Sequence, residues 1–389
     1  MIQNRRNHDP LQAKPALISN AAKTSLPVVA ALLLFWAIPP AFAYQANSVP
    51  VDAGSPARGS IAALHNMRVV ATTIDLVNGD QNPYGLVIVP SGAAGKLVAG
   101  DLLVSNINNA NNVMGSGTTI ELIQPSASKP APMTFFKGAA SPIAMVLNAN
   151  ATIVWIANYG LDQNGTQGNV DVVNNQGVLF AHGSIMNKDL WGSWGQGFNG
   201  QPVGGTVPPV FFDTNVLTGA VYRLQKFVAT SAGPDFAGAT ITQIAALGHT
   251  GWNITNVFGP QGMVWSKTND TLYIADPVNN RIVAVPHSTT TGNVGAGYTV
   301  FQGSPLKQPA GLAWNPLNGD LLAVNQGDNK LIEIDPNMHR VVAVRLLDKT
   351  PVVNGVGSAL FGLATTTDAA GHLEVYFTDD NTNTVNLLY

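Results

Sequence analysis

A pattern of apolar run, polar turn and second apolar run recurs along this chain and constrains its fold more than any other feature. The clearest copy is LYIADPVNNRIVAV, in which one run ends at Asp276 and the next begins at Arg281. Six such copies occur, about 55 residues apart on average. Their first runs end at Asn106, Asn158, Asp213, Asp276, Asn325 and Asp379.

A second element precedes most copies and completes the repeat. It reads Pro-x-Gly followed by an apolar residue in its regular forms, as in Pro83-Tyr-Gly-Leu and Pro309-Ala-Gly-Leu. Each unit then holds three or four short strands, which is typical of the blades of a β-propeller. A parallel β-solenoid is the alternative, but its repeats are shorter.

The two ends of the chain support six blades joined in a closed ring. The last unit stops after its third strand, and an additional strand is predicted at 67–74, before the first unit. Pairing of 67–74 with the last unit would leave no bare sheet edge. The predicted fold class is therefore all-β, a six-bladed β-propeller over residues 67–389, closed by an N-terminal strand that completes the last blade.

The composition favours β-strands and argues against nucleic-acid binding and against cysteine-based chemistry. Charged residues make up only 11% of the chain, and there are 39 Gly and 25 Pro residues. The net charge of −3 gives no basic footprint, so we expect no nucleic-acid partner. The chain has no cysteine, which excludes disulfides, thiolate metal sites and a thiol nucleophile.

The N-terminus has the pattern of an export signal. A basic segment precedes the apolar run 28–38, and an Ala-x-Ala sequence follows at 41–43. That run is shorter than the roughly 20 residues of a membrane-spanning helix. We predict a signal peptide at 1–43, a flexible lead-in at 44–66, a secreted or periplasmic location, and no membrane attachment after cleavage.

The recurrent Asn and Asp residues are predicted to be structural. Their side chains accept hydrogen bonds from backbone N–H groups two or three residues later, which fixes a turn between two strands. A position filled once per repeat is most simply a requirement of every blade. The interpretation of this ring as a metal or catalytic site is the weaker alternative.

The copy at 260–286 resembles the NHL repeat, in which an apolar strand ends in Asp, turns through Asn and resumes at Arg-Ile. The whole chain also resembles a group of uncharacterised secreted bacterial propellers with NP-Y/W-GL and GDLLV-x-N blocks. Both resemblances imply the propeller fold, and the second also implies export. Neither implies a substrate.

Six-bladed lactonases of the gluconolactonase kind provide a test of an enzyme hypothesis. They hold a divalent metal in the central tunnel through acids and amides near the Pro-x-Gly position. The corresponding residues here offer no carboxylate or histidine, and a cation such as Ca²⁺ needs several charged oxygens. We therefore expect no metal site and no cofactor. The residues are Tyr84, Ile143, Trp191, Gln261, Ala310 and Phe361.

The same positions predict a ligand site at the tunnel mouth. Aromatic faces stack on a ring or apolar group, and an amide fixes orientation. The candidate ligand-binding residues are Tyr84, Trp191, Gln261 and Phe361, with Trp191 as the stacking platform. The alternative is that Trp191 and Trp194 only pack an irregular third blade. The predicted function is a binding module for a protein, glycan or small molecule, and the alternative is a hydrolase or lyase with a site in the tunnel.

Overall fold

The computed structural model describes residues 59–138, 141–160, 167–200, 208–230, 233–251 and 257–389. Regular structure in these ranges is almost entirely β-strand. The helices among them are single 3₁₀ turns, η1 (Ile61–Ala63) and η2 (Lys188–Leu190). The predicted signal peptide and residues 44–58 of the lead-in lie outside the described residues.

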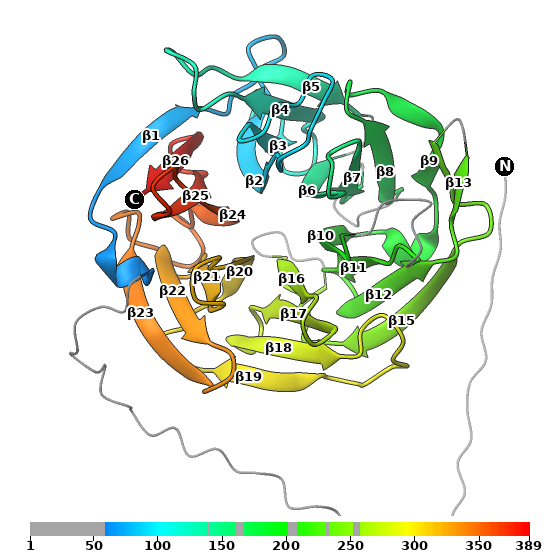
Figure 1. Cartoon of the computed structure of the whole chain (residues 1–389). Coiled ribbons are helices and arrows are strands. Elements are labelled where there is room, and N and C mark those ends of the chain that lie inside the picture. Colours follow the sequence, from blue (N-terminus) through cyan, green and yellow to red (C-terminus); the bar gives the residue numbers. More distant parts are fainter. Residues whose placement is uncertain (1–58, 139–140, 161–166, 201–207, 231–232, 252–256) are drawn as a thin grey trace, which may run out of the picture. The chain divides into compact units, whose positions relative to one another are not determined.

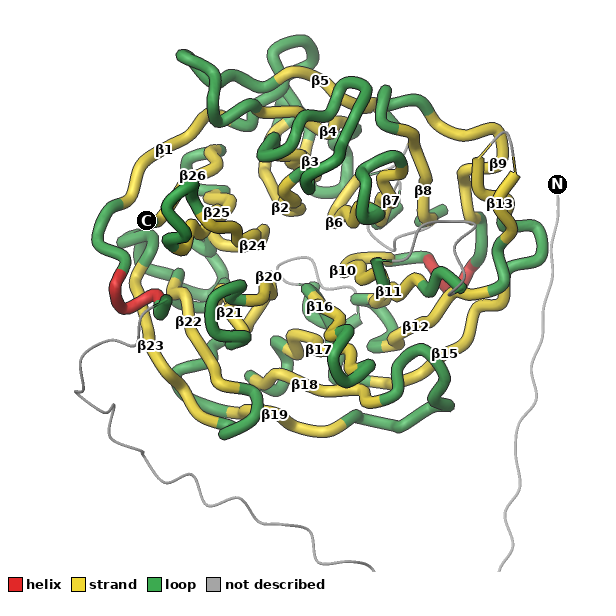
Figure 2. Tube along the Cα trace, viewed as in Figure 1, coloured by secondary structure: helices red, strands yellow, loops and turns green. Residues whose placement is uncertain are grey.

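Six four-stranded antiparallel sheets are arranged around a central axis as the blades of a β-propeller (Figures 1 and 2). Blade 1 consists of β2 (Gln81–Ile88), β3 (Leu102–Asn108), β4 (Thr119–Ile123) and β5 (Met133–Lys137). Blade 2 consists of β6 (Pro142–Leu147), β7 (Ile153–Asn158), β8 (Asn169–Asn174) and β9 (Leu179–Ile185). Blade 3 consists of β10 (Ser193–Phe198), β11 (Phe211–Asn215), β12 (Ala220–Gln225) and β15 (Thr240–Ala246). A small hairpin, β13 (Val228–Thr230) and β14 (Gly233–Asp235), is inserted in blade 3.

The other three blades complete the ring. Blade 4 consists of β16 (Met263–Ser266), β17 (Thr271–Asp276), β18 (Arg281–Pro286) and β19 (Tyr298–Gln302). Blade 5 consists of β20 (Pro309–Trp314), β21 (Leu321–Asn325), β22 (Lys330–Asp335) and β23 (Arg340–Leu346). Blade 6 consists of β24 (Leu360–Thr367), β25 (Leu373–Asp379), β26 (Thr384–Leu388) and β1 (Met67–Thr72).

Strand β1 closes the ring, as the sequence predicts. It pairs antiparallel with β26, from Met67 opposite Leu388 to Thr72 opposite Thr384. The last blade is thus built from both ends of the described chain, in the order β1-β26-β25-β24. The pairing covers an edge that β26 would otherwise expose.

Apolar side chains fill the space between neighbouring blades. The strands next to the innermost ones are buried on both faces, and all seven residues of β3 are buried. Between blades 2 and 3, the Trp155 ring stacks on the Phe211 ring with centroids 4.5 Å apart. Each blade therefore depends on its two neighbours for its core, which explains runs that are apolar throughout rather than alternating.

The glycine of the Pro-x-Gly element lies where two innermost strands almost touch. A Cβ on Gly85 would lie 2.2 Å from the carbonyl oxygen of Ile143 in the next blade. A Cβ on Gly195 would lie 1.9 Å from the Gln261 oxygen, and one on Gly311 would lie 2.2 Å from the Phe361 oxygen. Gly262 and Gly362 make the same approach to Ala310 and Tyr84, whereas blade 2 has Ala144 at this position. The motif therefore sets the width of the ring at its axis.

A β-bulge accompanies this close approach. In blade 1, Pro83 lies opposite Asn106 but Leu86 lies opposite Val104, so the inner strand holds one additional residue. The freed Gly85 N–H donates to the Ser105 hydroxyl at 2.8 Å. Thr214 and Thr378 accept the equivalent bonds in blades 3 and 6. The bulge turns the residue before the glycine towards the axis.

The end of the predicted flexible lead-in is docked on blade 5. The Ile61 side chain is fully buried, and the Ile61 N–H donates to the Glu333 carboxylate at 3.0 Å. The Ser60 hydroxyl donates to the same oxygen at 2.5 Å. The prediction of flexibility up to residue 66 is therefore wrong for 59–66, because one apolar side chain and one buried acid anchor the segment.

We expect Gly311→Ala to lower the free energy of unfolding by about 1–3 kcal/mol, because the new methyl would collide with the Phe361 carbonyl of the next blade. Gly292→Ala is the matched control, since a Cβ there meets no atom within 4 Å. Urea unfolding of both variants is the measurement. Equal stability of the two variants would contradict the role assigned to the inner-strand glycines.

Removal of β1 should open the ring. A chain beginning at residue 75 would leave β26 as an unpaired edge and would uncover the residues of the core between blades 6 and 1 that Val70 and Ala71 pack against. We expect a lower melting temperature and a broader transition by circular dichroism. The reference is a chain beginning at residue 67, which keeps β1 and also lacks the Ile61 anchor, and equal melting curves of the two would show that closure contributes nothing.

Candidate functional site: a tunnel mouth spanned by aromatic side chains

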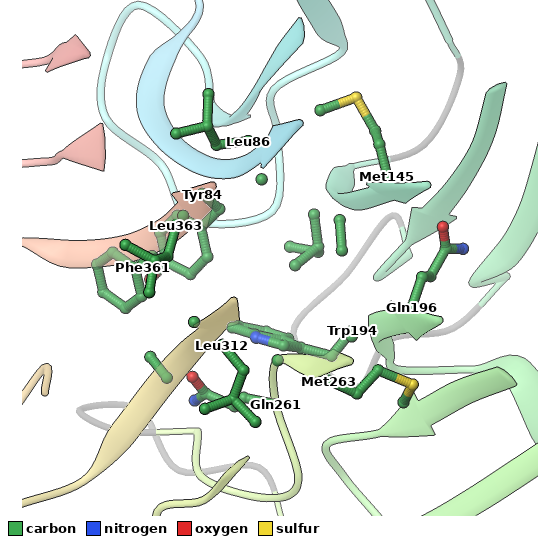
Figure 3. A pocket seen from close by; sticks show the side chains of 18 residues that line it. Tyr84, Leu86, Met145, Trp194, Gln196, Gln261, Met263, Leu312, Phe361 and Leu363 are labelled. Atoms are coloured by element: carbon green, nitrogen blue, oxygen red, sulfur yellow. The ribbon is translucent and has the colours of Figure 1, made fainter. Parts of the chain in front are cut away.

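The bulged inner strands direct two layers of side chains towards the axis, where they surround a cavity of about 100 Å³ (Figure 3). The first layer consists of the residue before each inner-strand glycine, and the second layer consists of the residue after it, with Ala144 in place of the glycine in blade 2. The first layer is Tyr84, Ile143, Trp194, Gln261, Ala310 and Phe361, and the second is Leu86, Met145, Gln196, Met263, Leu312 and Leu363.

Aromatic rings in the first layer span the tunnel. Tyr84 of blade 1 stacks on Phe361 of blade 6, with ring centroids 3.9 Å apart and planes 12° apart. The Trp194 indole of blade 3 reaches the edge of Tyr84, with centroids 5.5 Å apart, and also contacts Tyr159 at 5.8 Å. Figure 3 shows Trp194 extending into the centre towards Tyr84 and Phe361. These contacts join four blades, so the axis is constricted by a cross-blade aromatic cluster.

The residue that follows each Asn/Asp ring position forms the rim above this layer. In blades 1–3 the rim is apolar and consists of Ile107, Tyr159 and Val216, the last of which follows Asn215, the residue at the ring position of blade 3. These three side chains pack with Ile143 and Trp194 in one buried cluster. The corresponding residues are Pro277 in blade 4, Gln326 in blade 5 and Asp380 in blade 6. We define the tunnel mouth as this rim together with the first layer. By the apolar half of the mouth we mean Tyr84, Trp194 and Phe361 with the apolar rim of blades 1–3, and by the polar half we mean Gln261, Gln326 and Asp380.

A pair of buried amides forms part of the polar half. The Gln326 Nε2 donates to the Gln261 Oε1 at 3.2 Å, and both side chains are at most 6% exposed. The bond fixes the Gln261 oxygen as an acceptor from blade 5. The Gln261 amide nitrogen and the Gln326 oxygen are the groups that this bond leaves for a ligand.

Asp380 adds an acid with an unusual pKa to the same half. Burial raises its pKa from an ordinary 3.8 to about 7, and the charge of Asp379 also raises it, although a hydrogen bond with the Asn82 side chain opposes the shift. The Asp380 charge in turn raises the pKa of the Tyr84 hydroxyl, whose burial is the larger cause. Carboxyl groups whose pKa is raised by burial are enriched at functional sites.

Three of the four predicted ligand-binding residues converge at the tunnel mouth, and Trp191 does not. Tyr84, Gln261 and Phe361 line the cavity, as their position before the glycine indicates. Trp191 lies at the end of η2 with 41% of its surface exposed, and its carbonyl oxygen accepts a bond from Asn215. Blade 3 begins three residues later than the sequence pattern suggested, so Trp194 takes the place assigned to Trp191.

The predicted turn ring is also displaced in blade 3, by two residues. The inner strand of blade 3 pairs Ser193 with Asn215, which is the relation of Pro83 to Asn106 in blade 1. Asn215 therefore occupies the ring position in blade 3, and Asp213 lies two residues earlier. Asp213 is fully buried and accepts a bond from the Ser193 hydroxyl, and burial raises its pKa well above the ordinary value.

The ring residues make two kinds of contact. Asp276, Asp379 and Asn215 accept from backbone N–H groups two or three residues later, as in the bond from Thr382 to Asp379 at 3.1 Å. Asn106, Asn158 and Asn325 instead donate, for example from Asn106 Nδ2 to the Thr73 oxygen at 2.7 Å. The second kind ties the strand end to a neighbouring segment.

Sequence reasoning missed Trp194, Gln326 and Asp380. A signal for the first was available in the hydroxyl residue that precedes the ring position, Ser105, Thr214 and Thr378, which would have placed the ring at Asn215. The other two follow ring residues directly, and only the assembled ring shows that this position faces the axis. Within the described ranges, no three His, Asp or Glu side chains are grouped so that they could hold a metal ion.

Comparisons with known proteins support the fold. No protein-family model matches the chain, and no curated protein matches its sequence. Two solved structures from Bacteroides thetaiotaomicron are similar to it, namely a protein of unknown function (TM-score 0.53, 10% identity, 83% of this chain and 75% of that chain) and an auxiliary nutrient binding protein (TM-score 0.54, 12% identity, 83% and 76%). At such low identity the likeness shows a shared β-propeller fold alone. No helix in the described part of the chain could span a membrane.

Asp380→Asn should change how stability depends on pH. Because the folded pKa is about 7 and the ordinary value is 3.8, the folded protein retains a proton that the unfolded chain releases, so this group makes stability fall as pH rises from about 4 to about 7. The asparagine side chain does not titrate, so the variant does not lose this stability as the pH rises. We expect its stability relative to wild type to rise by on the order of a few kcal/mol across this window, measured by urea unfolding at pH 4.5 and 8. A pH-independent difference would contradict the raised pKa.

Proposed function

We propose that this protein is an exported binding protein that captures a small amphipathic ligand at the tunnel mouth. The observation that carries the proposal is the division of the mouth into an aromatic half and a polar half. The predicted signal peptide supports export, and the structural neighbour described as a nutrient binding protein is consistent with a binding role. A small ligand fits this site better than a protein or a glycan chain, because the cavity at the axis is only about 100 Å³.

The apolar half would hold one face of the ligand. Tyr84 and Phe361 are half-buried and stacked, so their exposed parts form one continuous aromatic surface next to Trp194. The rings are already in contact with one another, and their ordering therefore costs little entropy when a ligand binds. Stacking on such a surface contributes about 0.5–1.5 kcal/mol beyond the burial of area.

The polar half would determine which ligand binds. Gln261 and Gln326 offer one amide donor and one amide acceptor held by their mutual bond. Asp380 donates a hydrogen bond when protonated and accepts one when ionised, and its pKa of about 7 places both forms near neutral pH. A ligand with an apolar ring and hydroxyl or amide groups along one edge satisfies both halves.

A hydrolase or lyase with its site in the tunnel is the second candidate. The observation that favours it is Asp380, because a general acid or base works best when its pKa lies near the operating pH. Turnover of a bound compound by the wild type, lost in Asp380→Asn while binding persists, would establish the enzyme. Binding without turnover supports the binding protein.

The test is a screen of small metabolites that carry an apolar ring and hydroxyl or amide groups, with affinity measured by calorimetry. We expect Gln326→Ala to weaken binding of a hit about 5- to 30-fold, because a buried amide partner is lost from the mouth. Gln243→Ala, on the exposed outer strand of blade 3, is the matched control and should bind as the wild type does. A hit that binds Gln326→Ala with unchanged affinity would place its site away from the tunnel mouth.

A further inference from the structure

A second concave site lies on the face opposite the tunnel mouth. Each inner strand starts at the tunnel mouth, so the turn after it and the turn between the third and fourth strands lie at the other face. Between blades 4 and 5 these turns enclose a groove of about 400 Å³, which is within the range of about 300–1,000 Å³ typical of small-molecule sites. Its lining includes Trp265, Trp314, Tyr273, Lys267, Asn269 and Asn337.

The aromatic rings of this groove are held in fixed orientations. The Trp265 Nε1 donates to Asp270 at 3.1 Å, and the Trp314 Nε1 donates to the Trp265 carbonyl oxygen at 3.3 Å. The Tyr273 ring meets the Trp314 ring edge to face, with centroids 5.3 Å apart and planes at 85°. Both indole N–H groups are thus used within the protein. Since both tryptophans stay partly exposed, apolar ring surface is what they offer to the groove.

Exposed polar side chains surround these rings on both sides of the groove. Lys267, Thr268 and Asn269 belong to the β16–β17 turn of blade 4, and Asn337 belongs to the β22–β23 turn of blade 5. The Asn269 Nδ2 reaches the Tyr273 hydroxyl at 3.4 Å, which places this amide beside the aromatic cluster. Amides and hydroxyls on two blades therefore stand around an aromatic floor.

We propose that this groove is a saccharide-binding site for a neutral sugar unit or a short neutral oligosaccharide. A sugar ring has an apolar C–H face that packs on an aromatic ring and hydroxyls along its edges that pair with amides. The groove provides both kinds of partner: partly buried aromatic rings for the C–H face, and more exposed amides for the hydroxyls. Lys267 is the one charged residue in the lining, so hydroxyl recognition rather than ion pairing fits the described side chains.

The groove is separate from the proposed ligand site. It is formed by the opposite ends of the strands of blades 4 and 5, and the two sites share no lining residue. The turns that form it belong to neighbouring blades whose cores pack together through Tyr273, Leu312 and Leu321. A ligand that binds across the groove would therefore contact a rigid junction between two blades.

The experiment is titration of the exported protein, residues 44–389, with neutral trisaccharides: cellotriose, maltotriose, xylotriose and triacetylchitotriose. Binding is followed by calorimetry and by tryptophan fluorescence, which Trp265 and Trp314 should report. We expect binding of at least one trisaccharide, weakened about five- to tenfold by Asn269→Ala and by Asn337→Ala, since each removes one hydrogen-bonding amide. Both asparagines are exposed and lie outside the core, so weaker binding would not be due to unfolding of the variant.

Two variants locate the site. Asn150→Ala changes an exposed asparagine in the equivalent turn of blade 2 and should leave saccharide affinity unchanged. Asp380→Asn alters the tunnel mouth and should also leave it unchanged, so failure here and failure of the proposed function are distinguishable. Absence of binding by all four trisaccharides at millimolar concentration would overturn the proposal, and so would binding that Asn269→Ala and Asn337→Ala do not weaken.

Discussion

The close approach of neighbouring inner strands at the Pro-x-Gly element is the constraint on which the rest of this structure depends. At Gly85, Gly195 and Gly311, the carbonyl oxygen of the next blade occupies the space that a Cβ would need. Because the strands meet there, their bulges direct the preceding side chains to the axis. The same glycine thus sets the width of the tunnel and the positions in each blade whose side chains line it.

A fold of six similar blades becomes specific only where the repeat is broken. Five blades keep the glycine, but the residue before it ranges from Ala310 to Trp194. The position after the Asn/Asp ring varies in the same way, from Ile107 and Val216 on one side to Gln326 and Asp380 on the other. Because all blades share one backbone geometry, the differences between these side chains are what make one part of the tunnel mouth apolar and another part polar.

The irregular third blade shows where reasoning from a repeat fails. Leu190-Trp-Gly-Ser and Ser193-Trp-Gly-Gln both contain Trp-Gly, and the pattern alone does not say which one begins the inner strand. The hydrogen-bond ladder decides it by pairing Ser193 with Asn215. The contact of Gly195 with blade 4 fixes this register, and in the sequence only the hydroxyl of Thr214 before Asn215 indicates it, because the Trp-Gly pattern alone fits both positions.

The sequence by itself determined the strand-forming runs, the number of blades and a closing strand, predicted at 67–74 and observed at Met67–Thr72, because these depend on local apolar patterns and on a repeat that can be counted. It also indicated that Tyr84, Gln261 and Phe361 face the axis, because they occupy regular positions in that repeat. Only the tertiary structure brought Trp194 against Tyr84 and placed Asp380 in a buried setting that raises its pKa. It alone joined the turns of blades 4 and 5 around Trp265 and Trp314. These features depend on contacts between residues of different blades, and such contacts exist only once those blades have packed against one another.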